Sequence, residues 1–155
     1  MTAPKYLSLL LAGALAASVA LADEIVKNPS FESGAQYWRG DGKIVTLDGG
    51  NKVYEVEAGR KDKELFQQIE VADQQKITIR FKARALPGYE GGGLRIAFRT
   101  IKDNAGFTHR ELKAGEDWRE YKVSYTGKMR ADKREFAIVV KQGSGVVQFD
   151  DFQVE

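Results

Sequence analysis

The chain contains no cysteine, and this absence excludes several kinds of chemistry at once. Without a thiol there is no disulfide, zinc–thiolate site, iron–sulfur cluster or cysteine nucleophile. A single histidine, His109, excludes a metal site built from several imidazoles. An excess of one charge sign is also missing, because 24 basic residues stand against 22 acidic ones. This balance gives no general reason to expect nucleic acid or an anionic membrane as a partner.

The composition is typical of a folded domain. Of the 155 residues, 43% are hydrophobic and 30% are charged, which argues against disorder. The length suits one domain. Sixteen glycines, only three prolines, and many β-branched and aromatic residues favour an all-β fold.

Residues 1–22 have the three-part pattern of a secretory signal peptide. Lys5 precedes an apolar run at 7–21, and an A-x-A motif at 20–22 precedes Asp23. The apolar run is short for a membrane span, and the small-residue exit suits a signal peptidase better. We therefore expect a secreted protein, with no membrane span and a single mature domain over residues 23–155.

Alternation of apolar and polar residues with a period of two is the main pattern in the mature chain. In residues 76–84, Ile77, Ile79 and Phe81 alternate with polar residues, as expected for a strand with one buried face. The same pattern predicts further strands at 44–47, 53–57, 65–71, 94–99, 119–126, 136–140 and 146–154. Turn sequences separate them, for example at 48–51, 87–88, 91–93, 103–106 and 143–145. We predict an all-β, two-sheet antiparallel sandwich or jelly roll, with one helical turn at 129–134.

Three stretches of the mature chain resemble known signatures in their order and spacing. They are N-P-S-F-E-S-G at 28–34 with Trp38, Q-Q-I-E-V at 67–71 with the strand 77–83, and W-R-E-Y at 118–121 with Asp150-Asp151 near the end. Together they resemble carbohydrate-binding modules of the family 4, 9 and 22 type. The resemblance implies a jelly roll of the galactose-binding-like type. Residues 72–75 read A-D-Q-Q where such modules often have a Pro-Gly turn, and this affects the exact family more than the fold.

A structural calcium ion is the cofactor that this resemblance implies. On the matching positions, its ligands would be the side chains of Glu32 and Asp150 and backbone carbonyls near Ser30 and Lys52. Calcium needs six to eight oxygen ligands. The residues agree in part, because Asp150 and Asp151 interrupt an apolar strand and a carboxylate on its core side needs a partner. The alternative is that Asp150 bonds to the first loop without a metal.

Cations alternate with the buried positions of two successive strands and predict a basic surface. They are Arg80, Lys82 and Arg84 on one strand and Arg95 and Arg99 on the next. If both strands belong to one sheet, the cations share a face that suits uronic acids or sulfated sugars, because guanidinium groups bind such anions bidentately. Gln68 or Gln67 and Tyr54 would add hydrogen bonds and stacking from neighbouring strands. The alternative is a solvated face on which acidic neighbours offset the cations.

Aromatic residues are the second kind of candidate for sugar binding. Trp38 and Trp118 match core tryptophans of the resembling modules, and we expect both in the core. Tyr89 lies in the glycine-rich loop 87–93. It is either a ligand contact or a loop anchor whose ring packs on the sandwich.

The sequence thus predicts a non-catalytic module that binds an acidic or a plant or algal polysaccharide on one sheet face. Two other classes stay open: a structural or protein-binding sandwich in an exported assembly, and a small polysaccharide lyase. The lyase hypothesis depends on His109 and on Arg110-Glu111-Leu112, which resembles a strand motif of jelly-roll alginate lyases. Their other motifs are missing, and no hydrolase, phosphate-loop or zinc motif occurs.

The signal-peptide prediction has a direct test. We expect the exported protein to begin at Asp23, because the peptidase cuts after the A-x-A motif. Intact-mass spectrometry of the exported product measures this. A product that retains residues 1–22 would contradict the prediction.

Overall fold

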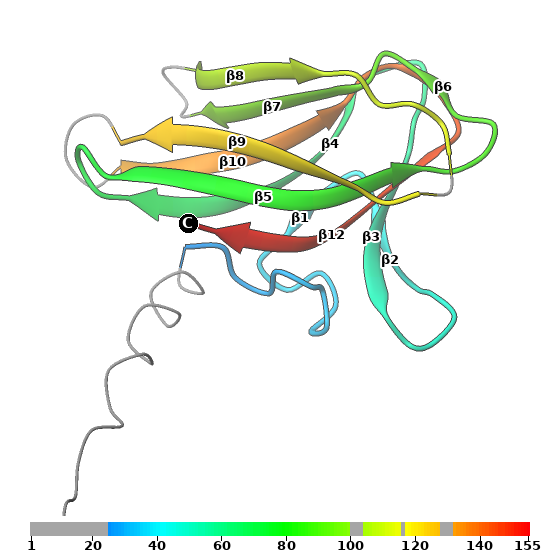
Figure 1. The fold of residues 1–155 in the computed structure, drawn as a ribbon, viewed down its shortest axis with the longest axis horizontal. Coiled ribbons are helices and arrows are strands. Elements are labelled where there is room, and N and C mark those ends of the chain that lie inside the picture. Colours follow the sequence, from blue (N-terminus) through cyan, green and yellow to red (C-terminus); the bar gives the residue numbers. More distant parts are fainter. Residues whose placement is uncertain (1–24, 100–103, 116, 128–131) are drawn as a thin grey trace, which may run out of the picture.

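The computed structural model describes residues 25–99, 104–115, 117–127 and 132–155, and all regular structure in these ranges is β-strand (Figure 1). The strands are β1 (Arg39–Gly40), β2 (Lys43–Thr46), β3 (Lys52–Glu57), β4 (Lys63–Val71), β5 (Lys76–Ala85), β6 (Glu90–Gly91), β7 (Leu94–Arg99), β8 (Asn104–Arg110), β9 (Arg119–Thr126), β10 (Asp132–Val140), β11 (Gly143–Ser144) and β12 (Val146–Val154). The predicted all-β class is confirmed. Within the ranges that are described, no helix has the length and apolar character to cross a membrane.

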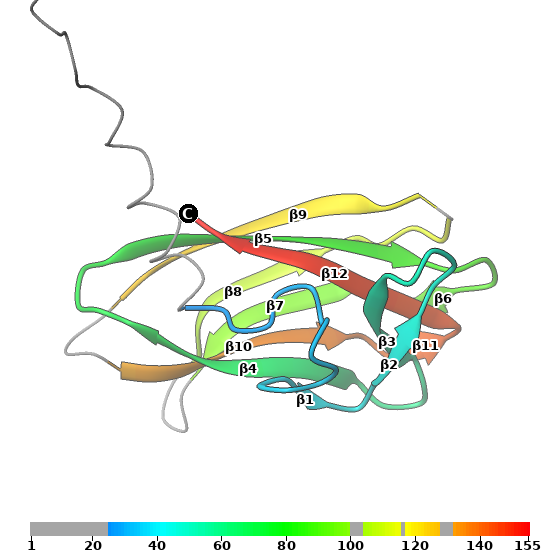
Figure 2. The same cartoon turned by 90° about the horizontal axis from the view of Figure 1, so that it is seen from below.

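Two antiparallel sheets of five strands form the two layers of a sandwich (Figure 2). The first has the order β1-β4-β10-β7-β8 and is called here the β10 sheet. The second has the order β2-β3-β12-β5-β9 and is called the β12 sheet. Strands β6 and β11 pair separately as a short ribbon. The sandwich predicted from the alternating pattern is therefore confirmed.

The core lies between the sheets because each long strand directs every second side chain inward. On β5, Ile79 and Phe81 are fully buried, and on β10 Phe136 and Ile138 are too. The Phe81 ring stacks on Tyr121 of β9, with ring centres 5.4 Å apart. Aromatic residues thus supply much of the apolar area that stabilises the sandwich.

An irregular segment, residues 25–38, is attached to the sandwich by two aromatic rings. Phe31 and Trp38 are both buried, and the Trp38 ring lies 4.6 Å from Phe152 of β12. The Trp38 indole N–H donates to the carbonyl of Asn28 (3.0 Å). Trp38 is therefore a core residue, as predicted.

The structure differs from the prediction in the bounds of some strands and in how the strands pair. Residues 104–106, predicted as a turn, begin β8, and β10 begins at Asp132 rather than at 136. Residues 132–134 of the predicted helical turn belong to β10, and 129–131 lie outside the described residues. The largest difference concerns pairing, because β5 and β7 belong to different sheets. Alternation identifies the buried face of each strand, but it contains no information about which strands pair.

Candidate functional site

The predicted basic surface does not exist, because its cations lie on opposite sides of the sandwich. Strand β5, with Arg80 and Arg84, belongs to the β12 sheet. Strand β7, with Arg95 and Arg99, belongs to the β10 sheet. Residues that point away from the core therefore emerge on opposite faces of the molecule. The prediction was wrong about the sheet, although it was right about the alternation within each strand.

On the outer face of the β12 sheet, the β5 cations are engaged by neighbouring polar groups. Arg80 contacts the Glu155 carboxylate (2.8 Å), and the Lys82 ammonium contacts Asp151 (2.7 Å). The hydrogen bond to Asp151 raises the pKa of Lys82. Arg84 donates through Nε to the Gln148 side-chain oxygen (2.8 Å). This face matches the alternative of a solvated surface with offset charges rather than an anion-binding face.

Tyr54 and Tyr89 are both buried, so neither ring is an exposed platform for a sugar. The Tyr54 ring lies 5.6 Å from Phe31, and its hydroxyl accepts the N–H of Gly42 (3.2 Å). The Tyr89 hydroxyl accepts the N–H of Gly93 (3.3 Å). Burial raises the pKa of both phenols. Of the two alternatives for Tyr89, a ligand contact or a loop anchor, the structure thus shows the loop anchor. The stacking role predicted for Tyr54 was wrong.

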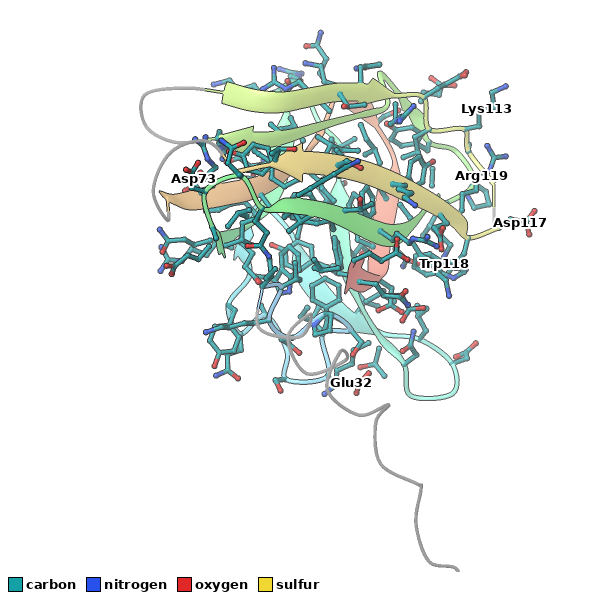
Figure 3. The ribbon with its side chains drawn as sticks, turned by 60° about the vertical axis from the view of Figure 1, so that its left-hand side comes forward. Glu32, Asp73, Lys113, Asp117, Trp118 and Arg119 are labelled. Atoms are coloured by element: carbon teal, nitrogen blue, oxygen red, sulfur yellow. The ribbon has the colours of Figure 1, made fainter. Side chains whose placement is uncertain are left out.

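Trp118 is half-buried and does not belong to the aromatic core, contrary to the prediction. The Arg84 guanidinium lies 4.7 Å from the centre of its ring. Figure 3 places Trp118 at one end of the sandwich, beside Arg119 and near Asp117. One face of its indole is therefore covered by a cation rather than by the core.

The outer face of the β10 sheet brings together the remaining candidates. Gln68 of β4 is opposite Glu135 of β10, and Glu135 is opposite Arg99 of β7. Arg95 lies on the same face, opposite His109 of β8. Directly opposed side chains in antiparallel strands are about 5 Å apart, so this row forms one continuous polar surface. Gln68, Arg95 and Arg99 are the predicted ligand-binding residues that share a face.

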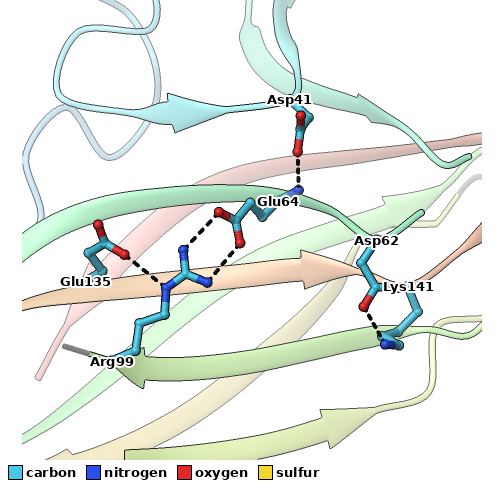
Figure 4. Close-up of polar contacts among 6 residues, drawn as sticks. All are labelled: Asp41, Asp62, Glu64, Arg99, Glu135 and Lys141. Atoms are coloured by element: carbon cyan, nitrogen blue, oxygen red, sulfur yellow. Dashed lines mark hydrogen bonds and ion pairs between the residues drawn. The ribbon is translucent and has the colours of Figure 1, made fainter. Parts of the chain in front are cut away.

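Arg99 is the centre of an ion-pair network on this face (Figure 4). Its two terminal nitrogens each donate to a carboxylate oxygen of Glu64 (2.9 Å), and its Nε donates to Glu135 (2.9 Å). The hydrogen bonds that Arg99 donates, chiefly to Glu64 and then to Glu135, raise the pKa of Arg99. The guanidinium also lies 5.6 Å from the Phe66 ring centre. Arg99 therefore orients the acidic groups of the face, and its charge is already neutralised.

Two further contacts stabilise the same region (Figure 4). The Asp41 carboxylate accepts the backbone N–H of Glu64 (2.9 Å), which attaches the chain after β1 to β4. Asp62 contacts the Lys141 ammonium, and this hydrogen bond lowers the pKa of Asp62. The strands that carry the network are thus also connected through side chains.

A pocket of about 470 Å³ opens beside this network, and it is called here the tyrosine pocket. Its lining combines aromatic, amide and charged side chains: Lys27, Tyr37, Trp38, Arg39, Phe66, Gln67, Gln68 and Glu135. The volume falls within the range of small-ligand sites. The pocket lies where the segment 25–38 and β1 meet the outer face of β4.

Tyr37 is the most unusual residue of the pocket. Its side chain is 53% exposed, and it is the only large hydrophobic residue classed as exposed in the described ranges. Its backbone has φ of 70°, a left-handed conformation that is uncommon for an aromatic residue. Such a conformation costs on the order of 1–3 kcal/mol and is often found at functional sites. The structure therefore holds an aromatic ring outward at the mouth of a pocket.

Of the residues that line the pocket, Gln68 was predicted from the sequence, while Tyr37, Lys27, Arg39 and Phe66 were not. Tyr37 directly precedes the signature Trp38, yet nothing in the sequence signals its positive φ or its exposure. Phe66 lies in a predicted strand, on the outer face of β4. The signal for Phe66 in the sequence is an aromatic residue at a strand position that the alternation assigns to the outer face.

The predicted calcium ligands gather where the first loop meets the last strand. The Lys52 ammonium donates to the backbone carbonyl of Glu32 (2.7 Å), while Asn51 donates to Asp150 Oδ2 (2.9 Å). Lys52 thus reaches the loop with its side chain, and the carbonyl ligand near Lys52 stays a prediction. The Glu32 side chain is exposed at the periphery (Figure 3), and Ser30 is half-buried in the same loop.

Asp150 has the chemistry of a cation ligand. It is 5% exposed, and its Oδ1 has no hydrogen-bond partner among the residues that the structure describes. Burial raises the pKa of its carboxyl, and the Asn51 hydrogen bond lowers it in part. Among the described residues, no group of three or more acidic or histidine residues lies close enough together to bind a metal ion. An unpartnered buried oxygen fits a calcium ion completed by backbone carbonyls and water, and the ion stays a prediction.

The fold has solved counterparts, although no protein-family model matches the chain and no curated protein matches its sequence. The structure of TmCBM61 in complex with β-1,4-galactotriose has a TM-score of 0.65 and 19% identity, covering 85% of this chain and 97% of that chain. The CBM22-1 xylan-binding domain from Paenibacillus barcinonensis Xyn10C has a TM-score of 0.63 and 14% identity, over 81% and 90%.

A different kind of protein has the same fold. The K1 cleaved adhesin domain of Lys-gingipain from Porphyromonas gingivalis has a TM-score of 0.57 and 15% identity, covering 81% of this chain and 95% of that chain. Other similar structures are carbohydrate-binding modules of families 16, 11 and 4. This chain thus has the jelly-roll fold of carbohydrate-binding modules, which confirms the predicted fold. At these identities the likeness establishes the fold alone.

The Asp150 site yields a prediction about pH and calcium. Folding raises the pKa of Asp150, so its contribution to stability is present at low pH and is lost as pH rises through the folded pKa. In chelator at pH 8, Asp150→Asn should melt no lower than the wild type. With calcium at a hundredfold excess over Kd, the wild type should gain about 2.7 kcal/mol, or several degrees, and the variant should not.

Asp151→Asn is the matched control for this experiment, because Asp151 is adjacent, pairs with Lys82 and has a φ of 51° that asparagine tolerates. It should keep the calcium response. Thermal melts by circular dichroism measure all three proteins. Identical wild-type melts with calcium and with chelator would eliminate the calcium site.

Proposed function

We propose that the protein is a secreted, non-catalytic carbohydrate-binding protein that holds a sugar in the tyrosine pocket. The observation that carries the proposal is the exposed ring of Tyr37, held outward by a left-handed backbone at the mouth of this pocket. Aromatic rings supply a large contact area at low cost in side-chain entropy. A sugar ring has an apolar face that packs on such a surface.

The polar groups of the pocket suit the hydroxyls of the same ligand. Gln68 is exposed and offers both a donor and an acceptor. Glu135 is held by Arg99 through one oxygen, which leaves the other as an acceptor at the pocket wall. A few fixed polar groups around an apolar surface orient a ligand. The fold supports the proposal further, because several solved carbohydrate-binding modules share it.

The finer features of the proposal are export and an acidic or plant or algal polysaccharide as ligand. Export is supported by the signal-peptide pattern of residues 1–22, which lie outside the described residues. An acidic ligand no longer has the support of a shared arginine surface. It is proposed instead because two cations, Lys27 and Arg39, line the tyrosine pocket.

A lyase activity has no comparable support. His109 is exposed on β8 and lies opposite Arg95 rather than an acidic residue. The acidic groups nearest the pocket are engaged by Arg99 as a structural network. The proposal is therefore sugar binding without catalysis. The alternative is a protein of an exported assembly that uses the sandwich for protein contacts, and the binding experiment below distinguishes the two.

Tyr37→Gly tests the proposal and separates binding from stability. Glycine adopts a positive φ without strain, so the free energy of unfolding should stay within about 1 kcal/mol of the wild type. Loss of the ring should weaken sugar binding at least tenfold, or about 1.4 kcal/mol. Calorimetry against soluble β-1,4-galactan, xylan, mixed-linked β-glucan, polygalacturonate and alginate measures the affinity.

Gln74→Gly is the matched control, because Gln74 also has a positive φ of 59° and is exposed in a turn away from the pocket. It should change neither the affinity nor the melting temperature by a large amount. If the wild type binds none of these polymers, the carbohydrate proposal fails. If Tyr37→Gly binds as tightly as Gln74→Gly, the sugar does not occupy the tyrosine pocket.

A further inference from the structure

The tyrosine pocket contains two cationic side chains that no carboxylate offsets within the described residues. The Lys27 Nζ lies 5.3 Å from the centre of the Tyr37 ring, and Arg39 projects from β1 at the position paired with Phe66. Both side chains are exposed. By contrast, three cations on the sheet faces each contact a carboxylate, namely Arg80, Lys82 and Arg99.

The backbones that carry the two cations are fixed in place. The buried side chain of Gln67 accepts the N–H of Lys27 (2.6 Å) and donates to its carbonyl (2.7 Å). Arg39 belongs to β1, which pairs with β4. Among the described residues, no acid bonds to their charged ends. Binding an anion would therefore cost side-chain freedom but would not require the backbone to rearrange.

The pocket has charge of opposite sign on its two sides. Arg39 lies on β1, at one edge of the β10 sheet, and Glu135 lies on β10, beyond β4. Because Arg99 bonds to both Glu64 and Glu135, the acidic side of the pocket is partly neutralised. The free positive charge is therefore concentrated on the side of β1 and Lys27. A ligand with one anionic group would bind in a single orientation, with that group towards β1.

We propose that Lys27 and Arg39 form an anion subsite of the tyrosine pocket, which binds the carboxylate of a uronic acid or the sulfate ester of a sulfated sugar. This inference rests on the proposed function and names the ligand class of the same site. Arg39 offers a planar fork that matches either oxyanion through two hydrogen bonds, while Lys27 offers a point charge next to the Tyr37 ring. The sugar ring itself would pack on Tyr37.

The test compares galactose-based polymers of different charge, and the dependence on salt separates the effect of charge from the effect of linkage. Calorimetry would use neutral β-1,4-galactan, polygalacturonate and a sulfated galactan, at low salt and at about 0.3 M salt, where ionic contacts are largely screened. The wild type should bind at least one anionic polymer about tenfold more tightly than neutral galactan, and added salt should reduce this preference. Preference for polygalacturonate or for the sulfated polymer identifies the anionic group.

Arg39→Gln should remove most of the preference for the anionic polymer and change neutral binding less than about twofold. Arg39→Lys should restore part of the preference, since it restores charge without the bidentate fork. Arg60→Gln, which removes an exposed arginine outside the pocket, is the matched control and should have no effect. Melting temperatures verify that each variant is folded.

The two proposals fail in different ways in this experiment. In one outcome, neutral and anionic polymers bind equally well and salt has no effect. If this binding is lost in Tyr37→Gly but kept in Arg39→Gln, the anion subsite is overturned and sugar binding in the pocket stands. An equal loss of anionic binding in Arg39→Gln and Arg60→Gln indicates general charge attraction and also overturns the subsite. Absence of binding to every polymer contradicts both proposals.

Discussion

Burial of the Phe31 and Trp38 rings against Phe152 is the interaction on which the rest of the site depends. It attaches an irregular segment of the chain to the last strand of the β12 sheet, with ring centres between 4.6 and 5.8 Å apart. Phe31 itself has a positive φ of 58°, a conformation that persists because the ring is fully buried. Without this attachment, Tyr37 and Lys27 would have no fixed position relative to β4.

Charge on the two sheet faces is organised by strand register. On the β12 face, cations of β5 are offset by acids near the end of β12, so the surface is close to neutral. On the β10 face, Arg99 connects acids of β4 and β10 across the sheet. Such partly exposed pairs add little to the free energy of folding, but they fix side-chain positions. The remaining uncompensated charge in the pocket comes from the irregular segment and the edge strand β1.

The fold was predictable because alternation is a local property of each strand. Residues 76–84, 94–99, 119–126 and 146–154 were predicted as strands, and the structure has strands over the same residues with shifts of one residue at most. The predicted turn at 103–106 failed because pairing with β7 holds Asn104 and Ala105 in an extended conformation. Turn-forming residues favour a turn only where no neighbouring strand competes for their backbone hydrogen bonds.

The sequence by itself determined most of the long strands, the sandwich class and the inward or outward direction of most strand residues, including the outward Gln68 and Arg99. Tertiary structure alone decided which outward residues meet, because sheet membership depends on contacts between strands far apart in the chain. It separated Arg80 and Arg84 from Arg95 and Arg99 and buried Tyr54 and Tyr89. It also left Tyr37 exposed, with a left-handed backbone directly before the buried Trp38, because exposure depends on how the whole chain packs.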